Sequence, residues 1–223
     1  MEYIPYQGQN EADVWLYLDE LERLDPERDA HTDIFDVLEK ISREPSGLRR
    51  LVERYADSHS AYVFGYVAAA ISHYARVQTS AAARDRAALD EITELTFKML
   101  RDARWLTARP DTLTGLLNTI GMLIWSGGWN KSLVPETFAE ILERCLKFGW
   151  PNEAQANLVR YQAFQILVYL SEAGMLTSQF NQDQITWFQK EVERYQAGLA
   201  PDDSLKSFTF NLAEPEGEGD AQP

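Results

Sequence analysis

The chain has 223 residues, 45% of them hydrophobic, so it can bury a sizeable core as one large domain or two small ones. Its formal net charge of −14 argues against nucleic acid and anionic membranes as partners, because an acidic surface repels both. A single cysteine, Cys145, rules out a disulfide framework within one chain and any Cys-x-x-Cys metal or redox motif.

Apolar residues at helical spacing predict five helices in the first half of the chain, over residues 11–24, 33–43, 45–57, 61–77 and 85–105. Ser58 or Ser60 is expected to cap the fourth of these helices, and Ser80 the fifth. The fourth helix is almost without charge until Arg76, so we expect it to be largely buried. In the fifth helix, apolar and charged residues alternate at helical spacing, which indicates that one face is exposed to solvent.

The middle of the chain, residues 112–130, contains no charged residue, although a quarter of all residues are charged. The stretch is long enough to cross a membrane, but Asn118, Ser126 and the Gly127-Gly128 break favour a buried helix that begins at Pro110. We expect four of its side chains to be almost fully buried, namely Leu116, Leu117, Ile120 and Leu123.

The second half of the chain is predicted to form helices over residues 134–150, 157–174 and 184–198. Asn181 or Gln182 is expected to open the last helix, and Gly198 to end it. The residues beyond it are rich in acids, glycine and proline. The sequence therefore predicts a single all-helical domain over residues 1–198 and an acidic, largely disordered tail over 199–223.

Three mostly apolar helices alternate with three amphipathic ones, and the apolar helices begin about 50 residues apart. Trp105 and Trp150, which both end amphipathic helices, lie 45 residues apart. This period resembles the stacked antiparallel helix pairs of HEAT-like α-solenoids, which implies that each pair buries its apolar helix against neighbours. We therefore predict an all-α fold, built either as such a solenoid over residues 33–198 or as an irregular helical bundle.

The chain shows no catalytic or metal-binding motif. Its three histidines, His31, His59 and His73, form neither an HExxH nor an HD pair, and metal ligands normally occur in recognisable clusters. There is no GxSxG turn and no phosphate-binding glycine loop, and Cys145 lies on the apolar side of a helix, where a thiol is usually inert. We expect no metal, no cofactor and no enzymatic activity.

Carboxylates gather on the wet faces of the amphipathic helices. Such runs usually form a solvated face, but they are also suited to recognising a basic protein, since complementary charge raises association rates and selects partners. The candidate partner-binding acids are Asp19, Glu20, Asp90, Glu91 and Glu94.

Four aromatic residues are further candidates for a protein interface. Trp129 follows a Gly-Gly turn and Trp187 lies beside Phe188 on an amphipathic helix, so either ring is a candidate for exposure, although most large aromatics at helical spacing are buried. Phe208 and Phe210 belong to an apolar part of the tail that is suited to docking.

Three functions remain open from sequence. The leading hypothesis is a cytoplasmic, non-enzymatic interaction protein that binds a basic partner through an acidic helical face, in the manner of immunity proteins or antitoxins; the N-terminus lacks the basic and apolar regions of a signal peptide. The second is an adaptor or structural subunit with residues 208–212 as a docking peptide. The third is a small-ligand binder or enzyme with a pocket between apolar helices, and its candidate polar groups are Tyr62, Tyr66, His73 and Tyr161.

Overall fold

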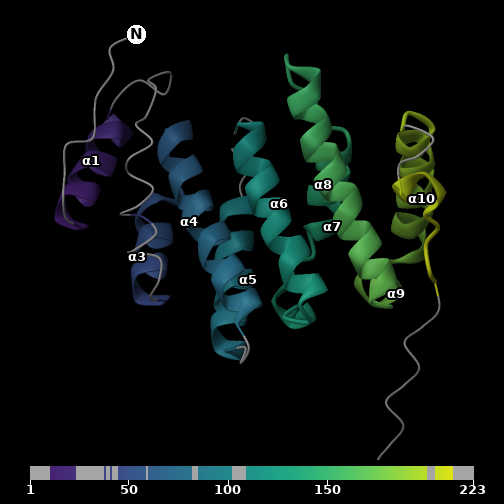
Figure 1. Cartoon of the computed structure of the whole chain (residues 1–223), viewed down its shortest axis with the longest axis horizontal. Helices are drawn as coiled ribbons and strands as arrows, with labels where there is room; N and C mark the ends of the chain where they lie inside the picture. The colour runs from purple at the N-terminus through teal and green to yellow at the C-terminus, as the bar shows by residue number, and fades with distance from the viewer. Residues whose placement is uncertain are drawn as a thin grey trace, which may run out of the picture. The chain divides into compact units, whose positions relative to one another are not determined.

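The computed structural model describes residues 11–23, 38, 41, 45–58, 60–81, 85–101, 109–199 and 204–212 (Figure 1). All regular secondary structure in these residues is helical, which confirms the predicted all-α class. The chain divides into two compact units, residues 1–134 and residues 135–223, and each is described by itself. The prediction of a single domain over 1–198 followed by a tail stays a prediction.

The first unit contains five α-helices and a short 3₁₀ helix within the described residues. They are α1 (Glu11–Arg23), α3 (Pro45–Tyr55), α4 (Ala61–Ser80), α5 (Arg86–Leu100), α6 (Pro110–Trp125) and η2 (Lys131–Leu133). α4 packs most extensively against α6, and the two lie side by side in Figure 1. α5 contacts both of them, and α3 contacts α4 and α5. Within this unit, the two apolar helices are therefore neighbours and share an amphipathic partner, as the alternation predicts.

Small residues let α4 and α6 approach closely. The Ser72 hydroxyl of α4 donates to the Gly115 carbonyl of α6 at 3.0 Å, and the Thr119 hydroxyl donates to Ser72 Oγ at 3.0 Å. A Cβ atom on Gly65 would lie only 3.1 Å from Thr112 Oγ1. Because Gly65 faces Thr112 while Ser72, further along α4, faces Gly115 and Thr119, the two helices run parallel.

The central helix is buried as predicted. Pro110 occupies its first turn, and the side chains of Leu116, Leu117, Ile120 and Leu123 are each 0% exposed. Full burial of a leucine or isoleucine side chain contributes about 1.5–3 kcal/mol each, so this helix is a main source of the unit's stability. None of the described helices combines the length and the apolar character that a membrane crossing requires.

The helix starts in this unit confirm one predicted cap and correct another. Ser60 caps α4, and its hydroxyl accepts from the Val63 backbone N–H. Ser80 does not cap α5 but is the last residue of α4; Asp85 caps α5 and accepts from the N–H groups of Ala87 and Ala88. An aspartate here serves better than a serine because its charge also interacts favourably with the helix dipole.

The helix predicted over residues 33–43 lies outside the described residues except for Leu38 and Ile41. Both of these are helical and buried. His31 and His59 also lie outside the described residues.

The second unit contains α7 (Phe138–Leu146), α8 (Glu153–Glu172), α9 (Leu176–Gln179), α10 (Gln182–Ala197) and the 3₁₀ helix η3 (Ser204–Ser207). α7 packs against α8 and α10. Asn181 caps α10 in a full capping box with Gln184, and Gly198 ends the helix, so both predicted boundaries are confirmed.

Residues 204–212 pack onto their own unit, although they fall in the stretch expected to be largely disordered. Lys206 Nζ donates to the carbonyl of Gln196 in the last turn of α10 at 2.6 Å and to the carbonyl of Leu199, two residues beyond the helix, at 3.1 Å. A cation at this position interacts favourably with the negative end of the helix dipole. The Phe208 ring meets the buried Phe164 ring of α8 edge to face at 5.9 Å.

Candidate functional site

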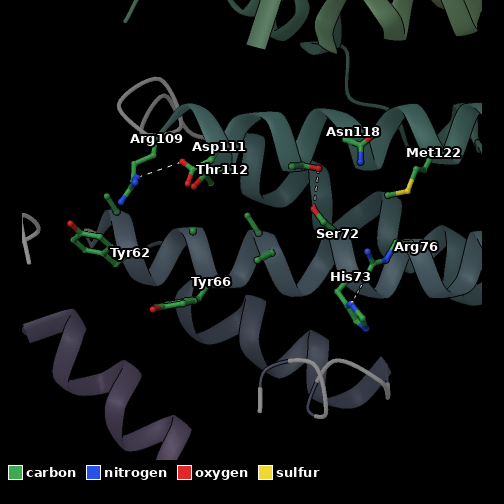
Figure 2. Close-up of a pocket in the computed structure, with 15 residues that line it drawn as sticks. Tyr62, Tyr66, Ser72, His73, Arg76, Arg109, Asp111, Thr112, Asn118 and Met122 are labelled. Atoms are coloured by element: carbon green, nitrogen blue, oxygen red, sulfur yellow. Dashed lines mark hydrogen bonds and ion pairs between the residues drawn. The ribbon is translucent and has the colours of Figure 1, made fainter. Parts of the chain in front are cut away.

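A cavity of about 580 Å³ opens along the line where α4 and α6 meet (Figure 2). We call it the α4/α6 groove. Its lining comes from one face of α4, one face of α6 and the residue that precedes α6, and consists of Ala61, Tyr62, Gly65, Tyr66, Ala68, Ala69, Ser72, His73, Arg76, Arg109, Asp111, Thr112, Gly115, Asn118 and Met122.

The floor of the groove is formed by small residues. Gly65, Ala69, Ser72 and Gly115 present little or no side chain, so the surface between the two helices stays hollow. The Ser72 hydroxyl is engaged with the Gly115 carbonyl, which satisfies this polar group at the bottom. The floor is therefore largely apolar and rigid, because it is part of the main helix–helix contact of the unit.

Tyrosines form part of the α4 wall. Tyr66 is only 5% exposed. Burial, and to a smaller extent the neighbouring Tyr17 and Tyr62, raise the pKa of the Tyr66 hydroxyl well above its usual value. The hydroxyl therefore stays protonated and neutral over the whole physiological pH range, and it is suited to hydrogen bonding rather than to proton transfer.

One end of the groove holds a compensated arginine. Arg109 precedes α6, and its Nε atom lies 3.5 Å from Asp111 Oδ1 in the first turn of that helix. The Arg109 guanidinium also lies 5.7 Å from the centre of the Tyr62 ring, within the range of a cation–π interaction. Figure 2 shows these three residues together at this end. The charges of Arg109 and Asp111 offset each other.

The opposite end holds Arg76 and His73 (Figure 2). Arg76 Nη2 lies 3.1 Å from His73 Nδ1. Arginine can only donate, so in this contact the guanidinium is the donor and His73 Nδ1 is the acceptor. Arg76 is exposed and forms no ion pair with a carboxylate of the described residues.

The groove lies in a part of the sequence whose charge differs from the rest. Residues 61–134 contain eight basic and six acidic side chains, which gives a formal charge of +2, whereas the whole chain carries −14. The helices that line the groove therefore belong to a stretch of sequence that lacks the acidic excess of the rest of the chain.

Three of the four predicted pocket residues come together here. Tyr62, Tyr66 and His73 all line the groove. Tyr161 does not: it lies on α8 in the other unit, where its hydroxyl accepts from Gln165 Nε2 at 3.1 Å. The sequence reasoning missed Arg76 and Arg109, although Arg76 follows His73 by one helical turn, which places both on the same face of α4.

Most of the predicted partner-binding acids have partners within the protein. Asp19 accepts from Arg54 Nε at 3.1 Å and from the Tyr55 hydroxyl at 2.6 Å. Asp90 pairs with Arg86 at 3.4 Å, and Glu91 pairs with Arg49 at 3.0 Å. These contacts reduce the charge that the three carboxylates can offer to another protein.

Two of the predicted acids, Glu20 and Glu94, are exposed. The basic partner itself stays a prediction.

Trp129, a candidate for exposure, is buried, as is usual for a large aromatic residue. Its side chain is 6% exposed and meets the Phe97 ring edge to face at 6.0 Å, because the Gly-Gly turn folds the tryptophan back onto α5. Trp187 is half-buried, with Lys147 Nζ 4.7 Å from its ring centre. Among the described tryptophans, Trp125 is strongly exposed, at 76%; it lies in the charge-free stretch, and no sequence signal separated it from the core.

The tail aromatics contact their own unit. Phe208 packs on Phe164, and Phe210 meets Phe208 edge to face at 5.6 Å. Both are half-buried. Their use as a docking peptide for another protein stays a prediction.

No group of three or more His, Cys, Asp or Glu side chains in the described part of the chain is placed to hold a metal ion. Compared with protein families, curated proteins and solved structures, the chain matches none of them. The features that indicate a function are therefore the geometry of the α4/α6 groove and the distribution of charge.

Proposed function

We propose that this protein binds a small amphipathic organic molecule in the α4/α6 groove. The observation that carries the proposal is the cavity itself: about 580 Å³, with an apolar floor and polar side chains at both ends. Ligand sites in proteins are typically concave, about 300–1,000 Å³ in volume, and mostly apolar with a few placed polar groups. No reaction is proposed, because the polar groups of the groove suit hydrogen bonding and charge pairing.

The size of the groove sets the affinity to look for. A ligand of about 15 non-hydrogen atoms that gains about 0.4 kcal/mol per atom binds with roughly 6 kcal/mol, a Kd of tens of micromolar. Titrations should therefore reach high micromolar concentrations of ligand.

The test uses N-phenyl-1-naphthylamine, a neutral fluorophore that brightens in apolar sites. We expect saturable binding to one site on the full chain. Ala69→Leu should abolish it, because the leucine fills the half-exposed floor between the two helices. Ala87→Leu is the matched control, since it adds the same side chain to an exposed position on α5, outside the groove.

Two results would contradict the proposal. One is the absence of saturable binding to the folded chain. The other is equal binding to the wild type and to the folded Ala69→Leu protein, because the fluorophore would then occupy another surface.

A basic protein partner is a second proposal, favoured by the distribution of charge. Outside residues 61–134 the chain carries a formal −16, and Glu20 is an exposed acid of that part. Glu94 is also exposed, on α5 within residues 61–134. The acidic surface would select a basic partner by complementary charge. The proposed location is the cytoplasm, where the buried Cys145 would stay reduced.

This second proposal is tested by co-purification at low salt and identification of the bound proteins by mass spectrometry. It is supported if a basic protein is retained by the wild type and lost with the double variant Glu20→Lys, Glu94→Lys. Retention of the same proteins by both chains would contradict it.

A further inference from the structure

We infer that the ligand of the α4/α6 groove carries an oxyanion, a carboxylate or a phosphate, which Arg76 binds at one end of the groove. This inference rests on the proposed small-ligand function and names the chemical class of the ligand. Its apolar body would lie along the floor of small residues.

The two ends of the groove differ in charge, and this difference sets the orientation. At one end, Arg109 faces Asp111 at 3.5 Å and stacks on Tyr62. At the other end, Arg76 has no carboxylate partner among the described residues and contacts the His73 ring. An anion therefore gains more at the Arg76 end, where the described residues place no carboxylate against the arginine.

The Arg76 guanidinium is also held in place. One of its five N–H donors is used by His73 Nδ1, at 3.1 Å. This contact limits the rotamers of the long side chain and leaves the remaining donors for a ligand. Two parallel N–H groups match the two oxygens of a carboxylate or phosphate, which makes such pairs both strong and directional. Asn118 of α6 lies across the groove at the same end (Figure 2) and can supply its amide to the same oxyanion.

The floor fixes the size of the apolar body. From Gly65 to Ser72 the axis of α4 rises about 10 Å, at roughly 1.5 Å per residue. That length accommodates two fused aromatic rings between the tyrosines of α4 and Met122 of α6. The electrostatic screening length in physiological salt is about 8 Å. An anion bound beside Arg76 therefore interacts mainly with this arginine and only weakly with acidic residues that lie further away.

The test compares three naphthalene compounds of matched shape by isothermal titration calorimetry on the full chain: 2-naphthoate, 2-naphthyl phosphate and the neutral 2-naphthamide. We expect at least one of the two anions to bind about tenfold or more tightly than the amide, as a charge-assisted hydrogen-bonded pair implies. Arg76→Gln should lower the affinity for the preferred anion to the level of the amide, and it should leave the affinity for the amide unchanged. Arg101→Gln, a change at an exposed arginine at the end of α5 and outside the groove, is the matched control and should leave all three affinities unchanged.

Each outcome decides between the alternatives. A preference for the phosphate or for the carboxylate that disappears in Arg76→Gln supports the inference and identifies the head group. The inference about Arg76 is overturned if the three compounds bind with equal affinity, or if the preference for an anion survives in folded Arg76→Gln. In either case, binding of the neutral amide still supports the proposed small-ligand function. If none of the three compounds binds and N-phenyl-1-naphthylamine does not bind either, the proposed function fails as well.

Discussion

α4 and α8 are both helices of 20 residues with mostly apolar sequences, yet their surroundings differ. α4 meets its neighbour α6 through glycine, alanine and serine, and a groove of about 580 Å³ follows the contact. α8 presents larger side chains, and residues 208–211 of its own unit cover part of it: Phe208 meets Phe164, and the Asn211 N–H donates to Ser171 Oγ at 2.6 Å. The apolar content of a helix therefore does not decide whether a site forms beside it; the size of the contact residues and the presence of a covering segment do.

The largest effect in this comparison should come from the covered helix. Phe164 is 0% exposed and touches both Tyr195 and Phe208, so Phe164→Ala leaves a large cavity. We expect a loss of about 3–5 kcal/mol in the free energy of unfolding, measured by chemical denaturation. Leu158→Ala on the same helix is the control, because that side chain is 55% exposed and should change stability by less than about 0.5 kcal/mol.

The second expected effect concerns Cys145, which is fully buried on α7 in the same unit as α8. Burial raises the pKa of its thiol from about 9 to about 12. The pKa of the thiol is higher in the folded state than in the unfolded state. The neutral thiol therefore makes its full contribution to the free energy of unfolding below about pH 9, and this contribution is lost as the pH rises toward 12. Between pH 8 and pH 11 we expect the wild type to lose roughly 2–3 kcal/mol more of its free energy of unfolding than Cys145→Ala loses. Parallel pH profiles of the two proteins would show that the thiol is accessible to water.

The covering segment itself should contribute less. Phe208 is half-buried, so Phe208→Ala should destabilise the second unit by about 2 kcal/mol, roughly half of what a fully buried phenylalanine contributes. Thr209→Ala, at an exposed neighbouring position, is the control. If both variants are as stable as the wild type, the segment does not hold α8 and its aromatics are accessible to a partner, as the adaptor hypothesis requires.

The smallest of these effects is expected at the floor of the groove. Ser72→Ala removes the hydrogen bond to the Gly115 carbonyl and the acceptor that Ser72 offers to the Thr119 hydroxyl. The Thr119 hydroxyl lies 3.0 Å from the same carbonyl and can donate to it instead. Because this carbonyl keeps a partner, we expect a loss of only about 1 kcal/mol in the free energy of unfolding. A loss as large as that of Phe164→Ala would mean that the floor is held by the hydroxyl pair rather than by helix packing.

The sequence was sufficient for features that depend on local chemistry. Periodicity located the buried face of α6, and cap residues located the start of α4 and both ends of α10. Tertiary contacts could not be predicted from the sequence. The burial of Trp129 depends on a turn that returns the chain to α5, and the ion pairs of Asp19 and Glu91 join residues 35 and 42 positions apart.

The groove was only partly predictable for the same reason. Tyr62, Tyr66 and His73 share one face of α4 and could be grouped from spacing alone. Arg109 joins them only because α6 packs in parallel beside α4, and Tyr161 is excluded because it belongs to the other unit.

The most direct test of the central claim is a titration of the isotope-labelled full chain with 2-naphthoate, followed by backbone amide chemical shifts in ¹H–¹⁵N NMR spectra. The account predicts saturable shifts concentrated at Gly65, Ala69, Arg76 and Gly115, with the same site lost in Ala69→Leu. Shifts concentrated around the exposed Trp125 or on α8, with the groove amides unchanged, would contradict it.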